Sequence, residues 1–122
     1  MPPNSSTLAA VPSVAKYKNA FRQISANLTP KQMAMLKAQY SAPRHTLTAT
    51  QLANAAGYKN FKGANLQYGI IGTMLREALN YWDDDGQASY VLSYFEKPDE
   101  EEWLIVMHKE VAQALRELKW TF

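Results

Sequence analysis

Two sequence signatures of a helix start constrain the fold most strongly. The segments Thr-Pro-Lys-Gln at 29–32 and Thr-Ala-Thr-Gln at 48–51 each place a glutamine three residues after a threonine. In this pattern the threonine side chain accepts a hydrogen bond from the backbone of the glutamine, whose side chain returns to the backbone of the threonine. Pro30 also suits the first position of a helix. We therefore expect one helix to begin at residue 30 and another at residue 49.

The second of these helices is predicted to be short and to lead into another helix. Gly57 lies where a C-terminal cap is expected, and a longer helical segment follows over 61–82. Ala53 is small enough to let crossing helices approach, and Gly57 can take the positive φ that redirects the chain. The spacing favours a helix-turn-helix, with a plain helical hairpin as the alternative reading.

Apolar periodicity predicts further helices over 14–25 and 30–40, and a last one over 109–119. Two segments rich in β-branched and aromatic residues, 89–96 and 103–107, predict a β-hairpin. The residues expected to face inward from the helices are Val14, Tyr17, Phe21 and Ile24, then Met33, Leu36 and Tyr40, and then Val111, Ala112, Leu115 and Leu118.

These elements define the expected fold class. It is α+β, mainly helical and winged helix-turn-helix-like, with one β-hairpin and a C-terminal helix. A single domain over 14–122 follows a flexible segment over 1–13, which is rich in Pro, Ser and Asn. Residues 41–46 are expected to form a loop and 83–86 a polar turn. Trp120 and Phe122 are expected to cover the edge of the core.

The long segment after Gly57 contains both a core stripe and three glycines. The stripe expected to face the core is Phe61, Ala64, Tyr68, Ile71, Leu75, Ala78, Leu79 and Trp82. Gly63, Gly69 and Gly72 would each destabilise a helix interior by about 1 kcal/mol relative to alanine. One possibility is that the helix begins only after Gly63 and covers 64–81, and another is that the face with Gly69 and Gly72 lies against a neighbouring helix or a partner.

Charge divides the chain into two unlike parts. From Met1 to Arg76 there are nine Lys or Arg and no Asp or Glu, whereas from Glu77 onward eleven carboxylates accompany four basic residues. The formal net charge of +2 conceals this separation. A basic half of this kind points to a polyanionic partner.

The basic half suggests a specific binding surface for double-stranded DNA. The N-terminal end of a recognition helix enters the major groove, where Asn or Gln can pair with adenine, and Lys or Arg with guanine or phosphate. A helix N-terminus also attracts phosphate. The candidate DNA-binding residues are Arg44, His45, Lys59, Asn60, Lys62, Asn65, Gln67 and Arg76. Each of them could instead belong to an ordinary solvated polar face.

The acidic half suggests the alternative. Asp99, Glu100, Glu101 and Glu102 lie at the tip of the predicted hairpin and would repel phosphates. They fit a small protein-binding regulator, such as a phage-type inhibitor or an accessory subunit, and could also bind the basic half of a second copy. A homodimer would also match the half-sites of a DNA operator.

Catalytic and metal-binding patterns are not recognisable. The Asp-Asp-Asp-Gly run at 83–86 lacks the alternating spacing of a calcium loop, and His45 and His108 have no cysteine or nearby histidine as partner. No serine elbow, phosphate-binding glycine loop or dinucleotide fingerprint is present. We expect a non-enzymatic protein without metal or cofactor.

Composition also bounds the compartment. The chain has no cysteine, and its first residues lack the basic and apolar regions of a signal peptide. No apolar run reaches the length that a membrane helix requires. We expect a soluble, cytoplasmic protein.

Three segments resemble a known module. They are Tyr-Ser-Ala-Pro-Arg-His at 40–45, Ala-Gly-Tyr-Lys-Asn at 56–60 and Ala-Asn-Leu-Gln-Tyr-Gly at 64–69. Together they resemble a poorly characterised bacterial module found as small stand-alone proteins and near the N-terminus of HNH-type, restriction-like endonucleases. The resemblance implies a DNA-directed role in bacteria or phage, linked to defence against foreign DNA. It assigns no functional residues, and the chain has no HNH centre.

Overall fold

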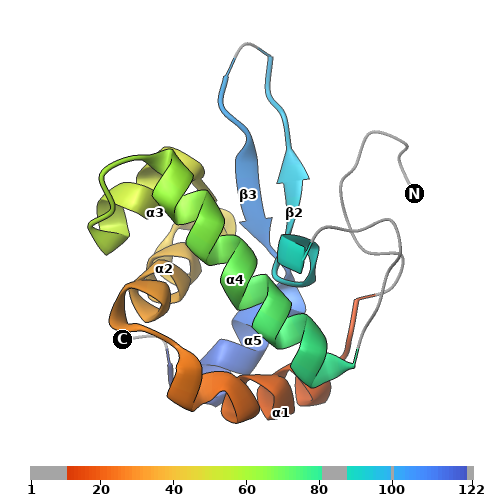
Figure 1. Ribbon diagram of the computed structural model, residues 1–122. Coiled ribbons are helices and arrows are strands. Elements are labelled where there is room, and N and C mark those ends of the chain that lie inside the picture. Colours follow the sequence, from red (N-terminus) through yellow and green to blue (C-terminus); the bar gives the residue numbers. More distant parts are fainter. Residues whose placement is uncertain (1–10, 81–87, 100, 121–122) are drawn as a thin grey trace.

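The computed structural model describes residues 11–80, 88–99 and 101–120, and it confirms the α+β class (Figure 1). The helices are α1 (Val14–Ile24), α2 (Pro30–Ser41), α3 (Ala49–Ala56), α4 (Phe61–Leu79) and α5 (Lys109–Glu117). The strands are β1 (Thr46–Thr48), β2 (Ser93–Glu96) and β3 (Leu104–Met107). Short 3-10 turns are η1 (Ser25–Asn27), η2 (Pro43–His45) and η3 (Ala88–Val91). Residues 1–10 of the predicted flexible segment, the turn at 83–86, Trp82 and Phe122 lie outside the described ranges.

The strands form one antiparallel sheet in the order β1-β3-β2. Strand β1 was not predicted, since residues 41–46 were interpreted as a loop and Thr46–Thr48 is too short to show a strand pattern. It exists because Thr46 and Thr48 pair with Val106 and Leu104, which lie almost 60 residues later in the chain. From α2 onward, the helices and strands follow one another in the order α2, β1, α3, α4, β2 and β3.

Both predicted capping boxes are present. The Thr29 hydroxyl accepts from the Gln32 backbone at 3.1 Å, and the Gln32 side chain accepts from the Thr29 backbone at 2.9 Å. Thr48 and Gln51 make the same pair of bonds, also at 3.1 and 2.9 Å. Because these contacts are local, the starts of α2 and α3 follow directly from the sequence.

The predicted turn between α3 and α4 is also confirmed. Gly57 caps α3 with a φ of 83°, and its N–H donates to the carbonyl of Ala53 at 2.9 Å. Ala53 is buried. Asn60 then begins α4, because its side chain accepts from the backbone N–H of Lys62.

Helix α4 continues through all three glycines, so the alternative of a start after Gly63 is wrong. Only Gly72 lies against another backbone. A Cβ at this position would come within 2.5 Å of the Ala88 carbonyl oxygen in η3, whereas a Cβ on Gly69 would meet nothing within 4 Å. Gly72 thus allows η3 to pack directly on α4.

Two residues that were expected in the core do not lie there, and one predicted strand is shorter than expected. Phe61 is 45% exposed, because it lies in the first turn of α4 at the mouth of a pocket rather than in the core. In α2, Met33 is only half-buried and lies off the core, whereas Leu36 is buried and Tyr40 packs against the core as predicted; Gln32, Met35 and Gln39 complete the buried face. The segment 89–96 is strand only in its second half, since Ala88–Val91 forms η3.

A buried polar network explains why α2 turns Gln39 inward. The hydroxyl of Tyr68 donates to the side-chain oxygen of Gln39 at 2.6 Å and lies 2.5 Å from the hydroxyl of Ser93. The Gln39 amide donates to Ser93 and to the Ile105 carbonyl. Burial raises the pKa of Tyr68 well above its ordinary value, so this hydroxyl stays protonated. The network joins α2, α4 and the β2–β3 hairpin.

Candidate nucleic-acid interface and an adjoining pocket

A cluster of cations surrounds the turn between α3 and α4. Lys59 and Lys62 are exposed on either side of the cap residue Asn60. Lys31, from α2, reaches the same turn: its Nζ lies 3.4 Å from the Gly57 carbonyl oxygen and 4.9 Å from the centre of the Tyr58 ring. We call Lys31, Lys59 and Lys62 the turn cluster. Lys31 was not among the predicted site residues, because only folding brings it beside a turn 26 residues later.

The other polar residues predicted on α4 point in different directions. The side-chain oxygen of Gln67 accepts from the Gln32 amide at 2.9 Å, so Gln67 is turned toward α2. Asn65 lines a pocket beside the hairpin. The outward face of α4, between the sides that carry Gln67 and Asn65, presents Leu66 and Ile70, which are 63% and 39% exposed. The helix therefore offers cations at its start and apolar side chains one and two turns later.

Arg44 and His45 belong to a different surface. They line a shallow cavity of about 440 Å³ together with Tyr94 and Val106. Successive side chains of a strand point to opposite faces, and the neighbouring residues Phe95 and Ile105 line the pocket beside α4 instead. Arg44 and His45 thus lie across the sheet from α4.

Local contacts hold His45 in place. Its Nδ1 lies 2.6 Å from the carbonyl oxygen of Tyr40, and its ring stacks on the Tyr40 ring with 5.0 Å between centroids. Both Arg44 and His45 have positive φ values, 56° and 52°. The backbone is therefore tightly bent where it leaves α2 and enters β1.

Arg76 is also distant from the turn cluster. It lies in the last turn of α4, fourteen residues after Lys62, which corresponds to about 21 Å along the helix axis. It is half-buried. The predicted DNA-binding residues therefore lie in separate places. Lys59, Asn60 and Lys62 lie together at the start of α4, with Asn65 at the edge, whereas Gln67 turns toward α2, Arg44 and His45 share a surface across the sheet, and Arg76 lies at the far end of α4.

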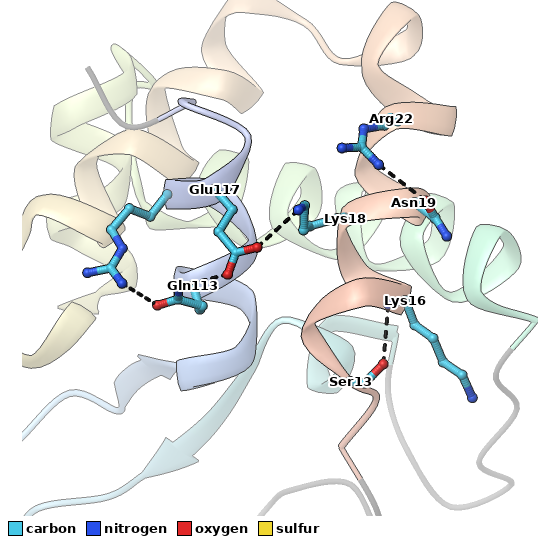
Figure 2. A network of polar contacts seen from close by, with 8 residues as sticks. Ser13, Lys16, Lys18, Asn19, Arg22, Gln113 and Glu117 are labelled. Carbon is cyan, nitrogen blue, oxygen red and sulfur yellow. Dashed lines mark hydrogen bonds and ion pairs between the residues drawn. The ribbon is translucent and has the colours of Figure 1, made fainter.

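Part of the basic half is neutralised by contact with the acidic half. Figure 2 shows Lys18 of α1 bonded to Glu117 of α5, with Nζ 3.0 Å from Oε1. Hydrogen bonds from Gln113 and Lys18 lower the pKa of Glu117. At this contact a charge of the basic half is offset by one of the acidic half, whereas Lys16 and Arg22 of α1 remain exposed.

The acidic hairpin has a structural contact of its own. Asp99, Glu101 and Glu102 are exposed, and Glu100 lies outside the described residues. One oxygen of Glu102, Oε2, accepts from the backbone N–H and the hydroxyl of Thr50 at 3.3 and 3.0 Å. A carboxylate at this position stabilises the N-terminus of α3. Glu102 therefore joins the hairpin to the helix pair, a role that the sequence did not indicate.

A pocket of about 670 Å³ opens between α3, α4 and the hairpin. Five of the eleven described residues that line it are aromatic, and four others are polar. Among the residues that line it are Thr50, Phe61, Asn65, Tyr68, Tyr90, Phe95, Glu102 and Trp103. The volume falls within the range of small-molecule sites.

Within the described ranges, no three His, Cys, Asp or Glu residues gather as a metal site would require. None of the helices described is both long and apolar enough to cross a membrane. No protein-family model, curated protein or solved structure matches the chain.

Proposed function

We propose that the protein is a non-enzymatic DNA-binding domain of winged helix-turn-helix type. The order α2, β1, α3, α4, β2, β3 places a helix pair before a β-hairpin, and β3 of that hairpin pairs back with β1, which supports this proposal. In this proposal α3 and α4 form the helix-turn-helix, and α4 approaches the major groove with its N-terminal end. α1 and α5 are additions at the two ends of that unit.

The observation that carries the proposal is the turn cluster at the start of α4. Lys59 and Lys62 flank the N-terminus of α4, whose backbone N–H groups favour an anion, and Lys31 contacts the turn that precedes it. No carboxylate precedes Glu77 in the chain, and Glu102 is engaged by Thr50 on the hairpin side. Phosphate is the anion that a surface of this kind would meet on DNA.

The same geometry limits how bases are read. Gln67 is bonded to Gln32, the Asn60 side chain caps α4, and Asn65 faces the pocket. Few polar side chains remain on the outward face of α4 to pair with base edges. We expect binding to depend mainly on phosphate contacts, with weak discrimination among sequences.

The hairpin would not serve as a DNA-tracking wing. Asp99 and Glu101 are exposed carboxylates that would repel phosphates. The proposal therefore places the hairpin away from the duplex.

The DNA-binding proposal also implies a cytoplasmic location, where bacterial or phage DNA is found. It agrees with a role in defence and with a homodimer that spans two half-sites.

Charge reversal in matched pairs tests the proposal. Lys59→Glu/Lys62→Glu and Lys16→Glu/Arg22→Glu each change the formal net charge from +2 to −2, but the second pair lies on α1, which is at the end of the molecule opposite the hairpin (Figure 1). Fluorescence anisotropy with a mixed-sequence duplex at low salt should show binding by the parent and loss of binding in the first variant. The second variant should retain binding within a few fold.

Equal losses in the two variants would mean that only the net charge matters. No binding by the parent at low salt would contradict the proposal. Circular dichroism of both variants is the control for folding.

A second candidate function is protein binding, and the exposure of Leu66 and Ile70 favours it. These residues lie four positions apart on the outward face of α4. The simplest case is a second copy, with the acidic hairpin against its basic half. Sedimentation at low salt would then show a dimer that dissociates in an Asp99→Asn/Glu101→Gln variant. If DNA binding is the sole role, neither this variant nor Lys59→Gln/Lys62→Gln would change sedimentation.

A further inference from the structure

The pocket between α4 and the hairpin combines aromatic walls with one type of charge. Phe61 and Trp103 are each 45% exposed, and they lie among the residues that line it. Tyr90 and Phe95 pack against each other with 5.6 Å between ring centroids. Tyr68 adds a ring at the buried side.

Glu102 is the only ionised residue among those described that line the pocket. Both of its hydrogen bonds to Thr50 use Oε2, so Oε1 accepts no hydrogen bond from the residues that the structure describes. Aromatic rings attract a cation through their negative faces, and a neighbouring carboxylate adds direct charge attraction. An anionic ligand would gain neither interaction.

We propose that this pocket binds a small organic cation, an ammonium or guanidinium group on an apolar body. The cationic group would lie near Glu102 and against the ring of Trp103, where both attractions act, and the apolar body would contact the rings of Phe61 and Phe95. Asn65 and Thr50 supply neutral hydrogen-bonding groups at the wall. The site shares α4 with the proposed DNA surface but does not include the turn cluster, so each proposal can fail independently of the other.

Three probes with one phenyl body test the charge preference: benzyltrimethylammonium, N-benzylacetamide and phenylacetate. Isothermal titration calorimetry on the full chain should show saturable binding of the cation, weaker binding of the neutral amide and no binding of the anion. Equal binding of the cation and the amide would overturn the proposal and indicate a site for neutral flat groups. Absence of saturable binding by the cation would also overturn it.

Two matched variants locate the site. Glu102→Gln retains an oxygen that can accept a hydrogen bond from Thr50 but removes the charge. We expect it to weaken cation binding by about tenfold, because this is the order of the attraction between two charges that are partly exposed to solvent. Glu101→Gln removes a carboxylate from the same hairpin that does not line the pocket, and binding should stay within twofold. Equal effects of the two variants would contradict a specific role for Glu102.

Two further measurements separate lost charge from a damaged pocket. Glu102→Gln should leave the affinity for N-benzylacetamide unchanged, since that probe carries no charge. Trp103→Ala removes an exposed aromatic wall and should weaken binding of both probes. If Trp103→Ala had no effect on the cation, the probe would bind elsewhere and the proposal would fail.

Discussion

The contact between α4 and η3 predicts opposite effects of one substitution at two glycines of the same helix. Gly69→Ala and Gly72→Ala both replace a glycine in the interior of α4, so both should gain about 1 kcal/mol of helix propensity. At Gly69 the new methyl group meets nothing within 4 Å. We therefore expect Gly69→Ala to raise the free energy of unfolding by up to about 1 kcal/mol.

At Gly72 the same methyl group would clash with backbone. It would lie 2.5 Å from the Ala88 carbonyl oxygen, 2.6 Å from the Ala88 carbonyl carbon and 2.8 Å from the Ser89 nitrogen. Backbone cannot rotate away as a flexible side chain can, and overpacking of this kind typically destabilises by about 1 to 3 kcal/mol. After the gain in propensity, Gly72→Ala should be neutral to about 2 kcal/mol less stable than the parent.

Urea unfolding followed by circular dichroism measures both variants. Because the propensity term is shared, the difference between the two free energies of unfolding isolates the clash, and it should be about 1 to 3 kcal/mol. Equal midpoints for the two variants would refute the close packing of η3 on α4.

Three further predictions concern the core and the caps. Tyr68→Phe removes the hydroxyl that bonds Gln39 and Ser93, and should lower the free energy of unfolding by about 1 to 3 kcal/mol in urea titrations; an unchanged midpoint would argue against the buried network. Burial lowers the pKa of His108 in the folded chain below its usual 6.5, so the unfolded chain binds more protons between the two pKa values. The free energy of unfolding should therefore fall as the pH drops from 6.5 to the folded pKa, and the contribution of His108 should be constant below that pH. Thermal melts of His108→Gln as a function of pH should lack this pH-dependent contribution. Thr48→Ala removes the cap of α3 and should lower stability by about 1 kcal/mol, and a melt identical to the parent's would contradict the capping box.

The parts of the fold that were predictable are those fixed by local chemistry. The capping pairs at Thr29 and Thr48 and the glycine cap at Gly57 act within a few residues, so the sequence alone located the helix pair. Strand β1 was missed because it exists only through pairing with β3. The inward position of Gln39 was not predictable, because its burial depends on hydrogen bonds to Tyr68 of α4 and to Ile105 of the hairpin.

The candidate site was predictable only where its residues are consecutive. Lys59, Asn60 and Lys62 lie together because they follow one turn. Arg44 was placed with them by charge alone, yet the sheet separates it from α4. The contact of Glu102 with Thr50 spans 52 residues, so no local pattern could reveal it.

The salt dependence of DNA binding tests the central proposal most directly. If the three lysines of the turn cluster neutralise three phosphates, the logarithm of the association constant should fall with the logarithm of salt concentration with a slope of about −2.7, a loss of roughly fortyfold between 50 and 200 mM. In Lys59→Gln/Lys62→Gln, with only Lys31 left, the slope should fall to about −0.9. A parent slope near zero, or an unchanged slope in the variant, would contradict the assignment of the turn cluster as the DNA-binding surface.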